Sequence, residues 1–171
     1  DENVNGRAGF SYTVIDMYGL THTGTVWIDL EPVNDTPEAV GESAIGSEDA
    51  TLLFTSASLL ANDSDIDGDA LRVSRVGEAS GGVVTMLPDG TVSFVPTPNY
   101  NGPAGYAYWV SDGSEEVRTE VRLNILQVND LPQVQGELVA SDEDVALNFP
   151  IATLLANDSD IDTDPVLSGE L

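Results

Sequence analysis

Hydrophobic and polar residues alternate along the stretch 117–125, which is the pattern of a β-strand with one buried face. The positions expected to point inward are Val117, Thr119, Val121, Leu123 and Ile125. Between 104 and 110 the same period places Tyr106, Tyr108 and Val110 on one side. Two such segments joined by a short polar connection indicate an antiparallel pair within a β-sheet.

Further segments of strand composition follow, separated by residues that favour turns. Strands are expected at 38–45, 50–56, 71–77, 82–87, 91–95, 104–110 and 116–128. Pro88-Asp89-Gly90 predicts a tight hairpin turn, and one helical turn is expected at 58–61. Tyr100 is either a tyrosine corner, with its phenol bound to backbone, or an ordinary half-buried tyrosine. The pattern predicts an all-β sandwich.

The chain repeats itself at an offset of ninety-five residues. Leu-Leu-Ala-Asn-Asp-Ser-Asp-Ile-Asp occurs at 59–67 and again at 154–162, and Val-Asn-Asp-x-Pro occurs at 33–37 and 128–132. We therefore expect tandem repeats of about 95 residues, with the C-terminal half of one at 1–35, a complete one at 36–131 and the N-terminal half of another at 132–171. With neither a start methionine nor a signal peptide, the chain is expected to be part of a longer protein.

Composition narrows the possible partners. The chain has 30 acidic and 5 basic residues and a net charge of −25. Such a surface repels nucleic acid and anionic membranes, so neither is an expected partner. No apolar run approaches the roughly 20 residues of a membrane-spanning helix, so no membrane insertion is expected. The absence of cysteine excludes disulfides and thiolate metal sites.

The repeated string carries carboxylates at alternate positions, and the strand order gathers acidic loops at the ends of each repeat. Because successive strands run in opposite directions, the loop at 48–49 lies at one end and the loop at 62–69 at the other. The linker at 34–35 and the loop at 112–113 are expected to meet the 62–69 loop. Each junction should then draw acids from two repeats and their linker. The candidate metal ligands are Asn34, Asp35, Glu48, Asp49, Asp63, Asp65, Asp67, Asp69, Asp112, Asn129, Asp130, Asp158, Asp160, Asp162 and Asp164.

Carboxylates gathered in this way need a cation or protons. Two carboxylates about 4 Å apart repel by about 1 kcal/mol in water and about 4 kcal/mol at an effective dielectric constant of 20. Ca²⁺ accepts about six to eight oxygen ligands in flexible geometry, whereas Mg²⁺ demands an octahedron and Zn²⁺ prefers nitrogen or sulfur. We therefore predict Ca²⁺ at the junctions. The alternative is that the acidic loops are merely solvated.

Two familiar kinds of site are excluded. Asp63, Asp65 and Gly68 fit the start of an EF-hand loop, but Ser74 stands where that loop needs a glutamate. Catalysis is not expected, since the chain has a single histidine, His22, and its paired carboxylates lie in polar loops without a desolvated pocket.

An exposed tryptophan raises a separate possibility. Trp109 is expected to point outward beside Arg118 and Arg122 of the neighbouring strand, and Trp27 occupies the position of Arg122 in the first half-repeat. An exposed indole can bind a sugar by stacking, or it can be covered by an arginine in a cation–π contact. His22 is expected to be an ordinary surface histidine.

Several motifs along the whole chain match one family as a set. They include Val-Asn-Asp-x-Pro, Asn-Asp-Ser-Asp-x-Asp-Gly-Asp-x-Leu, Asp-Gly-Thr-Val-x-Phe-x-Pro and Tyr-x-Val-Ser-Asp-Gly. Together they resemble bacterial cadherin-like tandem repeats of giant surface adhesins of the RTX and VCBS type. The resemblance implies a Greek-key, cadherin-like β-sandwich, Ca²⁺ between repeats and secretion to the cell surface. The acidic motif that animal cadherins carry is missing between Pro96 and Asn101.

The predicted function is that of a Ca²⁺-stiffened extender repeat, which holds a distal adhesive domain away from a bacterial cell. Its partners would be the neighbouring repeats of the same chain, and its location the bacterial cell surface. The alternative is a Ca²⁺-dependent module for polysaccharide binding or homophilic adhesion. A third possibility is the exchange of half-repeats between molecules.

Overall fold

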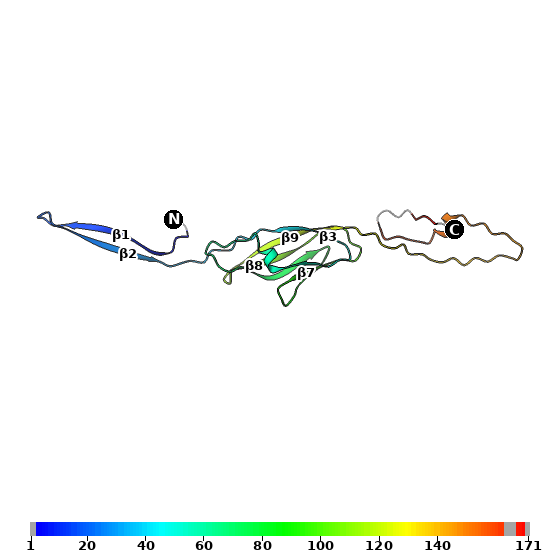
Figure 1. Ribbon diagram of the computed structural model, residues 1–171, viewed down its shortest axis with the longest axis horizontal. Helices are drawn as coiled ribbons and strands as arrows, with labels where there is room; N and C mark the ends of the chain where they lie inside the picture. The colour runs from blue at the N-terminus through cyan, green and yellow to red at the C-terminus, as the bar shows by residue number, and fades with distance from the viewer. Residues whose placement is uncertain (1–2, 163–166, 170–171) are drawn as a thin grey trace.

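The computed structural model describes residues 3–162 and 167–169 and is elongated, with a central β-sandwich and a slender extension at each end (Figure 1). The sandwich is formed by the complete repeat. The N-terminal extension is a two-stranded hairpin, and the C-terminal extension is a long loop with one helical turn. The architecture is therefore linear, as expected for a chain of repeats.

One sheet of the sandwich has four strands. In spatial order they are β3 (Glu42–Ser47), β9 (Glu116–Leu126), β8 (Gly102–Ser111) and β5 (Arg72–Ser80). Strand β8 pairs antiparallel with both β9 and β5, whereas β3 lies parallel to β9, with Glu42 opposite Val121. The first strand of the repeat thus lies beside the last, which places the chain ends of the repeat at opposite poles.

The second sheet has three strands. They are β4 (Leu52–Phe54), β7 (Val92–Pro96) and β6 (Gly82–Met86), in that order, and the helical turn α1 (Ser56–Leu59) follows β4. The predicted turn between β6 and β7 is present, because Gly90 has φ of 83° and the Leu87 N–H donates to the Thr91 carbonyl at 2.8 Å. Positive φ suits glycine, so the hairpin follows directly from the sequence.

The core lies between the two sheets and is built from the inward positions of their strands. Phe94 on β7 and Tyr108 on β8 are fully buried. The ring centroid of Tyr106 lies 5.8 Å from that of Phe54 on β4 and 6.0 Å from that of Phe94. On β9, the predicted inward residues Val121, Leu123 and Ile125 are all buried. The prediction of an all-β sandwich is confirmed.

Some strand boundaries differ from the prediction for local reasons. The first strand begins at Glu42 instead of residue 38, because the Val40 N–H is taken by the Asp63 carboxylate at 2.8 Å. Strand β4 ends at Phe54 because the Thr55 side chain accepts the Ser58 N–H and caps the helical turn. That turn therefore begins at Ser56, two residues earlier than predicted.

Tyr100 forms the predicted corner. Its hydroxyl donates to the Pro103 carbonyl, and its own N–H donates to the Thr97 carbonyl at 3.0 Å. The phenol thus ties the turn before β8 to the start of that strand.

Among the described residues, the N-terminal extension has a single sheet and the C-terminal extension has none. Strands β1 (Gly6–Ile15) and β2 (Thr21–Leu30) form one hairpin, in which Gly6 lies opposite Leu30. Phe10, Tyr12 and Val14 match Tyr106, Tyr108 and Val110 of the complete repeat in sequence, but they are between 49% and 58% exposed. At the other end, α2 (Ile151–Leu154) repeats the α1 turn. In the described part of the chain, no helix has the length and apolar character needed to cross a membrane.

Candidate metal centre at the repeat junctions

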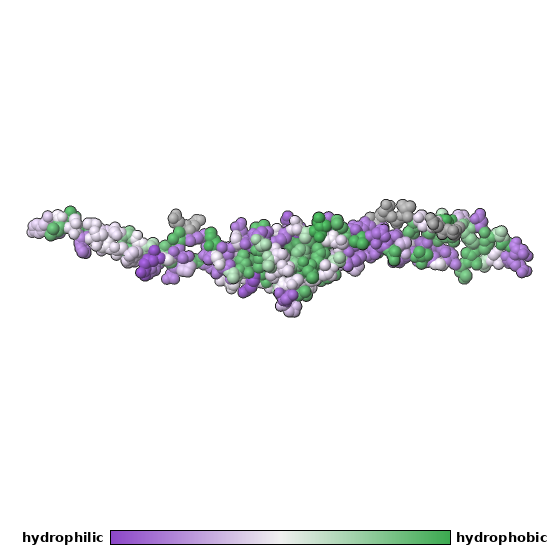
Figure 2. Space-filling view, viewed as in Figure 1, coloured by the Kyte–Doolittle hydropathy of each residue, from purple (hydrophilic) through white to green (hydrophobic). Residues whose placement is uncertain are grey.

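Two acidic junctions lie at opposite ends of the sandwich. The first junction comprises the linker 31–37 and the loop 62–69, and the second comprises the linker 127–132, the loop 157–162 and the loop at 48–49. Figure 2 shows hydrophilic residues gathered at both ends of the central sandwich. These junctions contain the candidate ligands that the sequence predicts.

A shared hydrogen bond ties each linker to its loop. The Asp35 N–H donates to Asp67 Oδ2 at 2.7 Å, and the Asp130 N–H donates to Asp162 Oδ2 at 2.8 Å. Asp130 lies ninety-five residues after Asp35, and Asp162 lies ninety-five residues after Asp67. The repeated motif therefore builds the same local backbone twice.

The first aspartate of each loop, Asp63 or Asp158, makes a second contact that is repeated between the junctions. Asp63 Oδ1 accepts the Val40 N–H and Asp158 Oδ1 accepts the Gln135 N–H, each at 2.8 Å. Burial raises the pKa of Asp63. These two aspartates fasten the loop to the start of the first strand, and the structure does not bring either of them into a group of candidate ligands. The buried Asp63 Oδ2 has no hydrogen-bond partner among the described residues, and the assignment of Asp63 and Asp158 as metal ligands stays a prediction.

At the second junction, carboxylates from three segments converge. Glu48, Asp130 and Asp162 each offer one oxygen, and these oxygens all lie within 4.8 Å of one another. Glu48 is only 3% exposed, and its Oε1 accepts the Val128 N–H at 2.6 Å. The group joins the loop before β4, the linker and the loop of the following repeat, as the strand order predicts.

The charges at the second junction are not balanced by protein groups. Asp130 Oδ2 is buried and has no hydrogen-bond partner among the described residues. The pKa of Asp130 is raised by burial and by neighbouring charges, of which Asp49 contributes most. By contrast, hydrogen bonds from the Gln127 side chain and the Asp130 N–H lower the pKa of Asp162. The surroundings of Asp162 thus favour its charged form, whereas those of Asp130 disfavour it.

At the first junction, the group comes from a single loop. Asp65, Asp67 and Asp69 place one oxygen each within the same 4.8 Å limit. Asp65 Oδ1 accepts the N–H groups of Asp67 and Asp69, whereas its Oδ2 is buried without a partner in the described chain. Among the described residues, the first junction therefore contains two buried carboxylate oxygens that lack a hydrogen bond, Asp63 Oδ2 and Asp65 Oδ2, and the second contains one, Asp130 Oδ2.

The Asp112 loop also reaches the first junction. Asn34 donates to Asp112 Oδ2 at 3.0 Å, and Asp112 Oδ1 accepts the N–H groups of Ser114 and Glu115. These bonds, chiefly that from Glu115, lower the pKa of Asp112. The predicted meeting of linker and loop is present, with Asn34 as the bridge.

Other predicted ligands lie at the edge of these groups. Asp49 has φ of 59° and its carboxylate accepts the Asn99 N–H at 3.3 Å. Asn129 donates to the carbonyl of its neighbour Asp130, and Asp160 accepts the Asp162 N–H. Asp35 contributes its backbone. Asp164 lies outside the described residues.

Sequence reasoning missed two residues. Gln127 holds Asp162 at 2.8 Å, but the equivalent position in the first linker is Pro32, so the repeat gave no signal. Glu42 points between the sheets and accepts the Tyr108 hydroxyl at 2.6 Å, and burial raises its pKa. The period of two could have identified Glu42, because it shares the inward side with Ala44.

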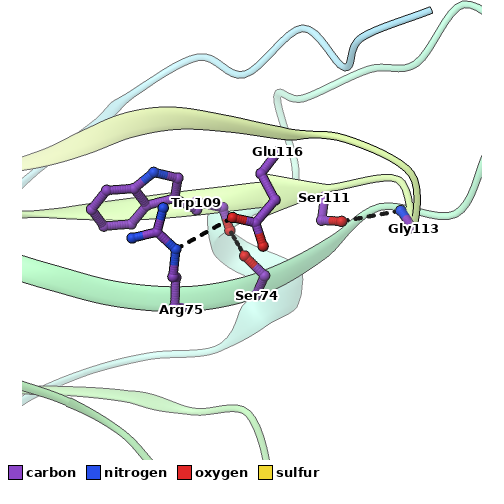
Figure 3. A network of polar contacts seen from close by, with 6 residues as sticks. All are labelled: Ser74, Arg75, Trp109, Ser111, Gly113 and Glu116. Carbon is purple, nitrogen blue, oxygen red and sulfur yellow. Dashed lines mark hydrogen bonds and ion pairs between the residues drawn. The ribbon is translucent and has the colours of Figure 1, made fainter.

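On the outer face of the four-stranded sheet, an arginine covers the ring of Trp109. The Arg75 guanidinium lies 3.5 Å from the centroid of the Trp109 ring and pairs with Glu116 (Figure 3). The predicted cation–π contact is therefore present, but the arginine comes from β5, whereas Arg118 and Arg122 on β9 pair with glutamates. Trp109 does not offer an open platform for sugars.

The arrangement suits a hard cation. Both groups supply only oxygen, both include an oxygen without a hydrogen bond, and neither includes a basic side chain. Ca²⁺ accepts such mixed carboxylate sets, and a bound cation would remove the need for Asp130 to take up a proton. In the second junction the residues that would hold it are Glu48, Asp130 and Asp162.

The family follows from the sequence match. The family model described as Cadherin-like domain matches residues 33–126, so the chain belongs to the cadherin-like domain family. It is accordingly an extracellular, adhesion-type β-sandwich module of a non-catalytic kind. Cadherin-like domains generally bind Ca²⁺.

Similar solved structures share only low identity. The endo-fucoidan hydrolase MfFcnA4 from glycoside hydrolase family 107 is 18% identical with a TM-score of 0.40, over 73% of this chain and 19% of that one. The surface layer protein SbsC, domains 4–9, is 18% identical with a TM-score of 0.30, over 82% of this chain and 22% of that one. The chain thus spans about a fifth of the length of these structures. No curated protein matches it.

Proposed function

We propose that this chain is a Ca²⁺-stiffened extender segment of a large bacterial surface adhesin. The observation that carries the proposal is the convergence of Glu48, Asp130 and Asp162 from two repeats and their linker within 4.8 Å. A cation held there would connect neighbouring repeats through oxygen ligands, and the linker could no longer bend freely. The partners are then the adjacent repeats of the same chain.

The repetition of the junction supports a linear array. The hydrogen bond from the Asp35 N–H to Asp67 recurs from Asp130 to Asp162, so successive linkers are bound in the same way. A strand of roughly 12 residues spans about 40 Å, so each added repeat extends a rod by about this length. Such a rod would hold a distal adhesive domain away from the bacterial surface. The motif resemblance to giant adhesins supports this setting.

Calcium supply would decide when the rod stiffens. When bound, Ca²⁺ supplies the positive charge that offsets the grouped carboxylates. Sites of the extracellular class have dissociation constants of about 10⁻⁴–10⁻³ M. In a calcium-poor cytosol the carboxylates of the second junction would repel one another, which agrees with the raised pKa of Asp130. The chain would then become rigid only outside the cell.

Thermal unfolding tests the proposal. Binding to the native state alone, at about 10 mM Ca²⁺ and the affinities above, raises the melting temperature by about 5–20 °C over that in EDTA. The same concentration of Mg²⁺ is expected to have a much smaller effect, because Mg²⁺ demands near-ideal octahedral geometry and gives up its waters reluctantly. An identical melting temperature in EDTA and Ca²⁺ would contradict the proposal.

A further inference from the structure

The hairpin β1–β2 has one face that points outward in a complete repeat. By the ninety-five-residue offset, Val26, Ile28 and Leu30 correspond to Val121, Leu123 and Ile125, which face the core. The other face remains exposed even where a second sheet is present. Its residues are Arg7, Gly9, Ser11, Thr13, Ile15, Thr21, Thr23, Thr25, Trp27 and Asp29.

Trp27 forms an open aromatic platform on this outer face. A Cβ atom at Gly9, directly across the strand pair, would lie only 2.7 Å from Cε3 of the indole, so the ring lies flat over that glycine. The opposite side of the ring is open, and Trp27 is 64% exposed. Trp109 differs, because Arg75 covers its ring. Of the two tryptophans, Trp27 is therefore the one available for stacking.

Polar groups flank the platform along the strands. On one side, Arg7 and Asp29 form a two-bonded ion pair at 2.8 and 3.3 Å, which leaves further N–H groups and oxygen lone pairs for a ligand. On the other side, Ser11 and Thr25 pair across the strands, followed by Thr13 and Thr23, whose hydroxyls are 3.1 Å apart. Hydroxyl groups both donate and accept, as the hydroxyls of a sugar do.

The charge and shape of this face select a narrow, uncharged ligand. Its two charges compensate each other, although the chain as a whole carries −25. Two ten-residue strands cover about 33 Å by 10 Å, or about 330 Å², which is less than the roughly 800 Å² per partner of a stable protein interface.

We propose that the outer face of hairpin β1–β2 binds an uncharged polysaccharide chain. One sugar ring stacks on Trp27 through its apolar C–H face, and the neighbouring units lie along the strands. They exchange hydrogen bonds with the Arg7–Asp29 pair and with the hydroxyls of Thr25 and Ser11. A protein partner fits less well, because the face is small and a second copy of this chain would carry the same large negative charge.

Fluorescence can report on this face alone. In the full chain with Trp109→Phe, Trp27 is the single tryptophan, and its emission is titrated with soluble cello-, manno- and chito-oligosaccharides. At least one of these is expected to shift the emission in a saturable way and to protect the indole from acrylamide quenching. Alginate, a polyanion, is expected to bind more weakly than the uncharged sugar that binds. No saturable change with any uncharged sugar up to about 10 mM overturns the proposal.

Substitutions then assign the site. By calorimetry, Trp27→Ala is expected to weaken binding at least about tenfold and Asp29→Asn about threefold, whereas Trp27→Phe retains part of the affinity. Trp109→Ala is the matched control and should leave the affinity unchanged. Equal affinity of Trp27→Ala and wild type, with the hairpin shown intact by NMR, overturns the proposal. So does a concentration-dependent dimer in sedimentation that Trp27→Ala abolishes, because that result assigns the face to a second copy.

Discussion

The two junctions share one backbone arrangement but differ in the origin of their carboxylates. In both, an aspartate N–H of the linker donates to the third aspartate of the repeated string, Asp67 or Asp162. At the first junction the grouped oxygens belong to Asp65, Asp67 and Asp69 of one loop. At the second they belong to Glu48, Asp130 and Asp162, which are far apart in sequence. The repeated acidic string thus contributes to a group within one loop at the first junction and to a group that connects two repeats at the second.

At the second junction, one of the three grouped carboxylates comes from the repeat on the N-terminal side. Glu48 belongs to the repeat on the N-terminal side of the second junction. Its carboxylate accepts a hydrogen bond from the Val128 N–H. At the first junction, Asp112 of the complete repeat accepts a hydrogen bond from Asn34 of the linker. Each junction needs parts of two repeats.

Removal of the bridging glutamate should have the largest effect. Glu48→Gln keeps the shape and an acceptor for the Val128 N–H but removes one charge from the bridge. We expect the Ca²⁺ affinity of the second junction to fall about 10- to 100-fold, measured by isothermal titration calorimetry. Glu143→Gln is the matched control, because Glu143 occupies the same position of the next repeat, is exposed and belongs to neither group of candidate ligands in the described residues. Equal losses in both variants would break the distinction between the junctions.

The second largest effect should be a difference in Ca²⁺ affinity between variants of the two linker aspartates. Asp130 contributes a carboxylate to the bridge, whereas Asp35 contributes only its N–H. Asp130→Asn is therefore expected to weaken Ca²⁺ binding about tenfold, and Asp35→Asn by less than about threefold, in the same calorimetric titration. Comparable effects would mean that the first junction also uses its linker carboxylate.

The pH dependence of stability in EDTA should have opposite signs at the two ends. The pKa of Asp130 is raised above its ordinary 3.8, so its charge destabilises the calcium-free fold at neutral pH, and this cost disappears as the pH falls through the raised pKa. The pKa of Asp112 is lowered, so its stabilisation is present above 3.8 and is lost as the pH falls through the lower pKa.

Melting curves of two variants in EDTA between pH 7 and pH 3 test these signs. Asp130→Asn should melt above wild type at pH 7, and the difference should shrink on acidification. Asp112→Asn should melt below wild type at pH 7 and approach it at the acid end. The same sign for both variants would be inconsistent with the assigned environments.

The smallest effect is expected from the linker asparagines. Asn34 bridges to Asp112, whereas Asn129 bonds only to the adjacent linker carbonyl. Asn34→Ala should lower the melting temperature by roughly 2–4 °C, and Asn129→Ala by less, as measured by circular dichroism. A larger loss for Asn129→Ala would reverse the proposed roles.

Periodicity predicted most of the fold. The alternation in β8 and β9 identified the core positions, and the ninety-five-residue offset identified both junctions before any geometry was known. It failed where a side chain competes for backbone. Asp63 takes the Val40 N–H, which delays the first strand, and Thr55 starts a helical turn that shortens β4. Such local hydrogen bonds leave the hydrophobic pattern unchanged.

The arginine over Trp109 escaped prediction for a different reason. Strand β5 has a register shift between Val73 and Arg75, so Val73 points inward while Arg75, two residues later, points outward. A strict period of two would have placed both on the same side. A β-bulge reverses this alternation and leaves little trace in composition.

The same holds for the candidate metal site. The sequence indicated which loops meet, because strand order determines the ends of a sandwich. It could not separate Asp65 and Asp67 from Asp63, which has the same chemistry but fastens a strand. It also gave no sign of Gln127, which lies outside the repeated motif and nevertheless holds Asp162.

The central claim is that Ca²⁺ joins two repeats at the second junction, and a distance measurement across it tests this most directly. The chain has no cysteine, so Leu53→Cys and Leu138→Cys, both at exposed positions on opposite sides of the junction, would carry the only spin labels. Pulsed electron paramagnetic resonance should give one narrow distance distribution in Ca²⁺ and a broad one in EDTA. Distributions of equal width in both conditions would contradict the account.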